Sequence, residues 1–108
     1  HHLRDLQTLF IDDGNMLRLD DNVGFCRNLR ILSFAGNLVT VCPLTLSALQ
    51  QLKVFNGSRN RICFFPNICG LTGLTHLNLS SNEVSTLPLQ IGDMAALEEI
   101  NIDNNKLS

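Results

Sequence analysis

Hydrophobic residues recur along this chain in one frame that is used five times. The frame has apolar residues at its positions 1, 4, 6 and 11 and a small or polar residue at position 9. Its copies begin at Leu6, Leu29, Leu52, Leu74 and Leu97, in steps of 23, 23, 22 and 23 residues. Of the twenty apolar slots, nineteen hold apolar side chains and Gly57 fills the last. A fixed period of this length is typical of solenoids, in which each unit packs against its neighbours.

Each copy of the frame predicts a short strand followed by an irregular return. Alternating apolar residues at positions 4 and 6 place two side chains on one face of a strand. Pro43, Pro66 and Pro88 each follow position 9 of their unit by six residues, and proline interrupts a hydrogen-bonded ladder. Because parallel strands need a crossover connection, this second half of the unit supplies it. We therefore expect an α/β solenoid with short parallel strands on its concave side and an irregular, 3-10 or short helical convex side.

Position 9 of the frame is asparagine in four of the five units. These residues are Asn37, Asn60, Asn82 and Asn105. A carboxamide both donates and accepts, so a buried stack of them can satisfy backbone groups where the chain leaves the strand. Gly14 holds this position in the first unit and has no such group. We therefore predict that the turn 12–17 is the least regular of the five.

The frame and its proline-containing half resemble the leucine-rich repeat family over nearly the whole chain. The fourth unit is similar to the family consensus almost letter for letter; it reads LTHLNLSSNEVSTLPLQIGDMAAL. The 23-residue step with its Leu-Pro-x-x-Ile half most resembles the intracellular repeats of Ras-binding scaffolds, and plant immune receptors of the nucleotide-binding class are similar. The resemblance implies a protein–protein interaction module that binds a partner protein through its concave face, in a scaffold or signalling role. The alternative is a regulatory or substrate-recognition segment of a larger enzyme or receptor, such as a phosphatase, kinase, ubiquitin ligase or immune receptor.

The predicted domain is one solenoid over residues 1–108, and we expect it to be a section of a longer array. No capping unit with a polar outer face is visible at either end of the sequence. Five strands present roughly 250 Å² of concave face. A standard interface takes about 800 Å² per partner. Flanking repeats or domains are therefore expected to contribute. His1 and His2 are interpreted as the remnant of a purification tag.

Charge and cysteine content narrow the partner and the compartment. The formal net charge of -2 argues against nucleic acid, and no apolar run approaches the roughly 20 residues of a membrane helix. Cys26, Cys42, Cys63 and Cys69 show neither a C-x-x-C spacing nor a nearby histidine, so we interpret them as reduced structural thiols. A reducing, cytoplasmic location follows, with no metal and no cofactor expected. The acidic turns around residues 12–13 and 20–21 lack a calcium-loop pattern and are interpreted as solvated.

The positions between the buried strand residues form columns across the concave face. The predicted partner-binding residues on them are Phe10, Ile31, Val54, Asn56, Arg59, His76, Asn78, Glu99, Asn101 and Asp103. Phe10, Ile31 and Val54 form either an apolar anchor or ordinary scattered surface residues. The polar remainder either contacts a charged or peptide-like partner or is a solvated face. The two alternatives stay open for each group.

Two rival functions are disfavoured by the same columns. An enzyme would need His76 to activate Ser58, Ser80 or Ser81, with Glu99 to orient it, and a His–Glu surface pair is the simpler interpretation. No catalytic residue is therefore predicted. An extracellular receptor module is suggested by the glycosylation sequons at Asn56 and Asn78, but glycans there would obstruct the concave strands.

Overall fold

The computed structural model describes residues 5–65, 68, 70–87 and 89–107. Outside the described residues lie His1 and His2, which were interpreted as a tag remnant, together with Pro66, Pro88 and Cys69.

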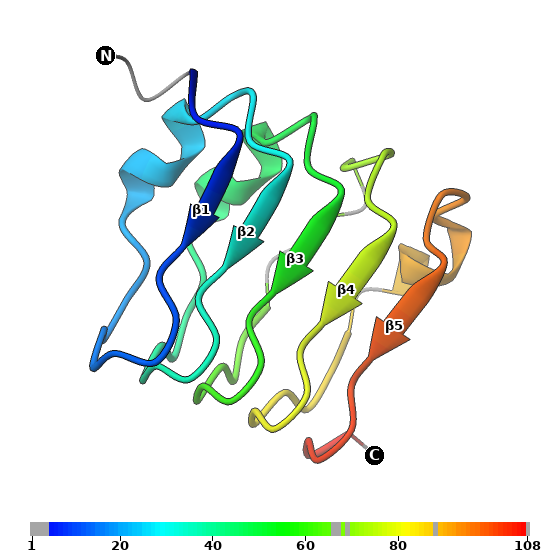
Figure 1. Cartoon of the computed structure of the whole chain (residues 1–108). Coiled ribbons are helices and arrows are strands. Elements are labelled where there is room, and N and C mark those ends of the chain that lie inside the picture. The colour runs from blue at the N-terminus through cyan, green and yellow to red at the C-terminus, as the bar shows by residue number, and fades with distance from the viewer. Residues whose placement is uncertain (1–4, 66–67, 69, 88, 108) are drawn as a thin grey trace.

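The strands of all five units form one parallel sheet. They are β1 (Thr8–Phe10), β2 (Ile31–Ser33), β3 (Val54–Asn56), β4 (His76–Asn78) and β5 (Glu99–Asn101), in the order β1-β2-β3-β4-β5 (Figure 1). Each strand starts two residues after the first leucine of its unit, and the middle residue of β2, β3 and β4 is buried. The predicted α/β solenoid of short parallel strands is confirmed.

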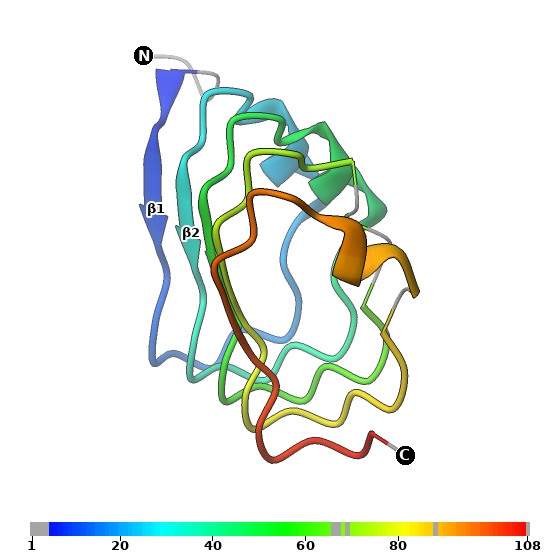
Figure 2. The ribbon, with the colours of Figure 1, turned by 90° about the vertical axis from the view of Figure 1, so that its right-hand side faces the viewer.

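The return half of three units contains a short 3-10 helix on the side opposite the sheet. These helices are η2 (Asp21–Phe25), η3 (Leu44–Ala48) and η4 (Leu89–Asp93), and the end-on view shows them across the core from the strands (Figure 2). Asp20 caps η2, because its Oδ1 accepts a hydrogen bond from the Asn22 N–H at 2.8 Å. Pro43 precedes η3 in an extended conformation, as expected for the residue that turns the chain onto the convex side.

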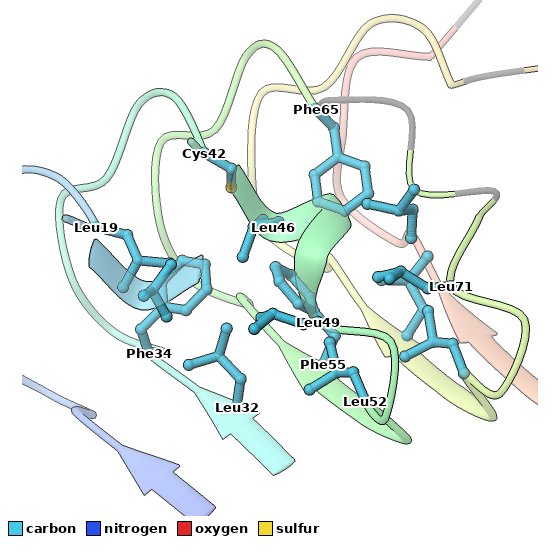
Figure 3. Close-up of a cluster of buried hydrophobic side chains, with 14 of the residues drawn as sticks. Leu19, Leu32, Phe34, Cys42, Leu46, Leu49, Leu52, Phe55, Phe65 and Leu71 are labelled. Carbon is cyan, nitrogen blue, oxygen red and sulfur yellow. The ribbon is translucent and has the colours of Figure 1, made fainter. Parts of the chain in front are cut away.

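The core lies between the sheet and these helices and repeats from unit to unit. Leu32, Leu46, Leu49 and Leu52 are fully buried (Figure 3), and so is Leu29. Each such side chain contributes about 1.5–3 kcal/mol relative to exposure. A second feature of the core is an aromatic row, in which the Phe34–Phe55 and Phe55–Phe65 ring centroids lie 5.4 Å and 5.5 Å apart, edge to face.

Gly57, the one gap in the hydrophobic frame, is filled by its neighbours. A Cβ at this position would lie 3.0 Å from Phe34 Cζ, 3.2 Å from Phe55 Cε1 and 3.3 Å from Ile62 Cδ1. The two phenylalanines and Ile62 therefore fill the space that the apolar side chain at position 6 occupies in other units. A side chain at this position would therefore push against both rings and Ile62.

Restoring the consensus at this position is expected to destabilise the protein. Gly57→Leu should lower the free energy of unfolding by about 1–3 kcal/mol, because the larger side chain overpacks a filled core. Urea denaturation monitored by circular dichroism measures the change. The double variant Gly57→Leu/Phe34→Leu should recover part of the loss. A melting midpoint of Gly57→Leu equal to or above that of the parent chain would contradict this packing account.

The asparagines form a clamp between successive units. The Oδ1 of Asn60 accepts a hydrogen bond from the Val39 N–H of the preceding unit at 3.0 Å. Its Nδ2 donates to the Phe34 carbonyl of that unit and to the Gly57 and Ser58 carbonyls of its own, at 3.0–3.1 Å. The other three asparagines bond in the same way to their own unit and to the one before. The predicted role of these residues is confirmed.

The prediction for the turn 12–17 is wrong, and the direction of the clamp explains why. Asp13 has φ 56°, in line with Arg59, Ser81 and Asn104 at 54–58° in the equivalent turns. Asn37 of the next unit accepts from the Gly14 N–H at 3.2 Å and the Met16 N–H at 3.1 Å. The asparagine of the following unit thus holds this turn, and Gly14 lacks only the bonds that the asparagines of later units donate to carbonyls of their own unit.

Removing one clamp should cost much more than removing an exposed asparagine. Asn60→Ala leaves the buried Val39 N–H without a partner and removes three further bonds, so we expect a loss of about 2–3 kcal/mol in the free energy of unfolding. Asn15→Ala, in an exposed turn, is the matched control and should stay within about 0.5 kcal/mol. Chemical denaturation of the three proteins measures both effects. Equal losses in the two variants would show that the clamp carries no stability.

Both ends of the described solenoid expose residues of core type. A hollow of about 250 Å³ at the β1 end is lined mainly by apolar side chains, among them Leu6, Leu9 and Met16. At the β5 end Ile100 and Leu107 are 42% and 39% exposed. The longer array expected from the sequence stays a prediction.

Candidate partner-binding surface

The strand register produces the columns that the sequence predicts. Thr8, Ile31, Val54, His76 and Glu99 are consecutive partners across the sheet, and so are Phe10, Ser33, Asn56, Asn78 and Asn101. These residues flank the inward-facing middle residue of each strand and therefore lie on the outer, concave face. The clamp described above fixes this register from unit to unit.

The predicted apolar group is divided between two places on this face. Ile31 and Val54 are half-buried and lie side by side on β2 and β3. Phe10 is 62% exposed on the edge strand β1, in the other column and beside Ser33. Large exposed apolar residues also occur away from the concave face. Val41 and Phe64 are two of them, and they form a parallel bridge between the return segments that follow β2 and β3.

Six of the predicted contact residues meet in one hollow. It has a volume of about 300 Å³, spans β3 to β5, and is lined by Val54, Phe55, Asn56, His76, Leu77, Asn78, Glu99 and Asn101. His76 lines it from the middle strand, β4: its Nδ1 is 2.8 Å from Thr75 Oγ1, and its Nε2 is 3.7 Å from Glu99 Oε2. The imidazole is thus oriented by two neighbours, and the Glu99 side chain stays 72% exposed.

The asparagine column in the hollow presents hydrogen-bond donors. The Oδ1 atoms of Asn56, Asn78 and Asn101 accept from the backbone N–H two residues further on, at 3.0–3.1 Å. Their Nδ2 groups have no acceptor among the described residues. Neighbouring strands are about 4.8 Å apart, so the three amides form a row of donors at that spacing.

Ser33 interrupts the asparagine column, and Asp12 of the preceding unit takes over the bond. The Asp12 Oδ1 accepts from Ser33 Oγ at 2.7 Å and from the Ala35 N–H at 2.8 Å. The Ala35 N–H is equivalent to the groups that Asn56 and Asn78 cap in later units. Asp12 was expected to be a solvated turn residue, and the structure gives it this structural role instead.

Arg59 is held by another part of the face. Its Nη1 donates to Asp13 Oδ1 at 3.2 Å, across the intervening unit, where Gly36 has φ 70° and no side chain to obstruct the contact. Both side chains are more than half exposed, so the pair contributes at most about 1 kcal/mol. The two charges offset each other, which leaves Arg59 less available to a partner than the sequence suggests.

A further column lies along the rim where the strands begin, and the sequence reasoning missed it. Its members are Gln7, Arg30, Lys53, Thr75 and Glu98. From Arg30 onwards, each N–H donates to the carbonyl of the preceding member at 2.7–2.8 Å. Arg30, Lys53 and Glu98 are exposed and form no ion pair with any described residue. Position 2 of the frame would have identified this column.

The other reactive side chains of the described residues include a buried serine and three cysteines. Ser58 is buried, and the side-chain contacts of His76 are with Thr75 and Glu99. No group of three potential metal ligands comes together in the part of the chain that the structure describes. Nor does that part contain a helix that is long and apolar enough to cross a membrane. Cys26, Cys42 and Cys63 are free, and burial raises the pKa of the Cys42 thiol from 9.0 to about 12.

Comparison with known proteins identifies the architecture. No family model matches the chain. Solved structures that superimpose on it include the LRR ectodomain of the plant membrane receptor kinase GASSHO1/SCHENGEN3 of Arabidopsis thaliana, with a TM-score of 0.83 and 25% identity over 95% of this chain and 13% of that one. A leucine-rich repeat protein of Leptospira interrogans gives a TM-score of 0.77 and 23% identity over 97% of this chain and 33% of that one. The chain is a leucine-rich repeat solenoid.

Curated relatives of this leucine-rich repeat solenoid are much longer proteins. The calmodulin-binding receptor kinase CaMRLK of Arabidopsis thaliana is 36% identical over 68% of this chain and 11% of its own length. Adenylate cyclase of Schizosaccharomyces pombe is 36% identical over 76% of this chain and 5% of its own length. A third is the leucine-rich repeat and calponin homology domain-containing protein 1 of Mus musculus, which is 36% identical over 69% of this chain and 11% of its own length. The chain therefore spans about a tenth or less of these relatives.

Proposed function

We propose that this solenoid is a protein–protein interaction module that binds a partner protein through its concave face, in a scaffold or signalling role. The observation that carries the proposal is the hollow across β3 to β5, where the amide donors, His76 and Glu99 surround an apolar floor. Such a mixture of apolar surface and unpaired polar groups is typical of recognition sites. The plant receptor ectodomain was solved in complex with CASPARIAN STRIP INTEGRITY FACTOR 2, which supports the same use of this architecture.

We further propose that the solenoid itself is not an enzyme. The hydroxyl that reaches His76 is Thr75 Oγ1, 2.8 Å from Nδ1, and it donates its proton to the Lys53 carbonyl at 3.0 Å, so His76 is not placed to act as its base. The hollow is also open and contains exposed Glu99, whereas catalysis by a perturbed group relies on burial. Binding is the activity that these side chains can perform without further groups.

Charge placed on the apolar part of the concave face should abolish capture of the partner. Ile31→Asp plus Val54→Asp is expected to reduce recovery from a lysate by about tenfold or more, which corresponds to ~1.4 kcal/mol. Val41→Asp plus Phe64→Asp, an equally charged and equally adjacent pair outside this face, is the matched control and should retain the partner. Quantitative mass spectrometry of the captured proteins measures both.

Folding of the two double variants must be compared by thermal melting, because Ile31 and Val54 are half-buried. The milder pair Ile31→Thr and Val54→Thr, which keeps β-branched residues in the strands, provides a second test if the aspartates unfold the protein. Capture that survives every concave change, in proteins that remain folded, would show that the partner binds elsewhere.

A second function is favoured by the relatives: a regulatory or substrate-recognition segment within a larger enzyme or receptor. A receptor kinase, two adenylate cyclases and a probable serine/threonine-protein kinase all match this chain over a small part of their length. The endogenous polypeptide can be recovered with an antibody against this chain. Its mass and its enzymatic activity together distinguish a scaffold module from a segment of a larger enzyme or receptor. A product far above 12.0 kDa that carries an enzymatic activity supports the segment, and one without such activity supports the scaffold.

We also propose an intracellular location, supported by the three cysteines among the described residues, all of which are free. Alkylation of the native protein before lysis should modify Cys63, which is exposed, and spare Cys42. The reason is that burial raises the pKa of Cys42 to about 12, so its thiol stays protonated and unreactive at neutral pH. Peptide mapping by mass spectrometry reads both sites. Cys63 found in a disulfide in the native protein would contradict the proposed location.

A further inference from the structure

Two neighbouring columns of the concave face change character from one end to the other. Arg30 and Lys53 on the rim stand next to Ile31 and Val54 at the starts of β2 and β3. At the other end, Glu98 and Glu99 stand next to each other at the start of β5. We call the surface formed by these six residues the rim strip. It is basic and aliphatic over β2 and β3, and acidic over β5.

The charges of the rim strip lack partners within the described residues. Arg30, Lys53 and Glu98 form no ion pair there, and Glu99 approaches only His76, at 3.7 Å. The contrast is with Asp13 and Arg59, just beyond the C-terminal ends of β1 and β3, which neutralise each other at 3.2 Å. The rim strip is therefore a surface with opposite unpaired charges at its two ends, and such surfaces orient a complementary ligand.

The spacing of these charges matches an extended polypeptide that crosses the strands. From β2 to β5 there are three steps of about 4.8 Å, or ~14 Å. Four residues of extended chain cover ~13 Å, and residues i, i+2 and i+4 point to the same side. An acidic residue i over Arg30 and Lys53 thus places residue i+4 over Glu98 and Glu99. Residue i+2 then lies above Val54 and His76, where an aliphatic side chain has apolar contact.

The donor row beside the strip supplies main-chain contacts. The Nδ2 groups of Asn56, Asn78 and Asn101 lie one column further along the strands and have no acceptor among the described residues. Carbonyl groups that point to one side of an extended segment recur every ~6.6 Å, so two of them fall within the ~10 Å length of the row. An anionic polymer such as nucleic acid fits poorly, because Glu98 and Glu99 would repel it.

We propose that the rim strip binds an extended segment of a partner protein in which an acidic and a basic residue are four positions apart, with an aliphatic residue midway. The proposal rests on the proposed binding function and specifies its partner. Either chain direction is allowed, because the acidic residue goes to β2 and β3 and the basic residue to β5 in both.

Synthetic peptides with a shared framework test this pattern on the intact chain. The probe contains Glu-Ser-Leu-Ser-Arg between Gly-Ser ends, and the controls contain Glu-Ser-Leu-Ser-Glu or Arg-Ser-Leu-Ser-Arg. We expect the mixed-charge probe to bind about fivefold more tightly than either control. Titration followed by amide chemical shifts measures the affinities, and the shifts should centre on Ile31, Val54, His76 and Glu99. The preference should shrink near 1 M salt, where the screening length is about 3 Å.

A charge reversal at one end of the strip provides the sharper test. Glu98→Lys plus Glu99→Lys makes both ends basic, so the preferred probe should become Glu-Ser-Leu-Ser-Glu, by about fivefold. Asp21→Lys plus Asp93→Lys makes the same charge change on the convex helices and should keep the original preference. Thermal melting establishes that both variants are folded.

The outcomes separate this proposal from the general function. Equal affinities for the three peptides, no binding of any of them, or no switch in the reversed variant would overturn the proposed pattern. If partner capture is nonetheless lost in the concave aspartate pair, binding through the concave face stands and only the charge pattern is wrong. If capture persists in that pair, the proposed function itself fails.

Discussion

The structure depends on one constraint: the backbone groups at the turn of each unit must find hydrogen-bond partners inside a dry core. Unpaired buried groups of this kind cost about 1–3 kcal/mol each. The carboxamides of Asn37, Asn60, Asn82 and Asn105 satisfy them, and each reaches the unit before its own. The clamp therefore couples neighbours as well as satisfying turns, and the units cannot slide relative to one another without breaking it.

This coupling explains why the concave face can serve recognition. The strands are only three residues long, so they cannot hold a register by themselves. With the register fixed by the clamp and the buried leucines, side chains from units 22 or 23 residues apart line up in columns. The 300 Å³ hollow and the two charged ends of the rim strip both result from this alignment. A preorganised surface of this kind loses little conformational entropy when a partner binds.

The sequence predicted what repeats and missed what depends on a single pair of residues. The period located every strand, the core leucines and the clamping asparagines, because these positions obey one frame. The role of Asp12 could not be predicted, since it follows from the absence of an asparagine at Ser33 on the next strand. Arg59 reaches Asp13 only because Gly36 lies between them, which requires knowledge of three units at once.

Two further differences between the prediction from the sequence and the structure have a simple physical origin. The prediction for the turn 12–17 considers only its own glycine, whereas Asn37 of the following unit also bonds to this turn. The rim column of Arg30, Lys53 and Glu98 was overlooked because the concave face was taken to begin one position later. In both cases the answer depends on which neighbouring residue a side chain contacts. The repeat pattern predicts that contact only when the direction in which the units stack is known.

Hydrogen exchange at the clamped amides tests the central claim most directly. The N–H groups of Val39, Ile62 and Val84 donate to asparagine Oδ1 atoms of the next unit at 2.9–3.0 Å. If the clamp holds the solenoid together, these three amides exchange only through global unfolding, as slowly as the strand-ladder amides of Phe34 and Leu79. Exchange as fast as that of exposed turn amides would contradict the account, because the turns would then open independently of the sheet.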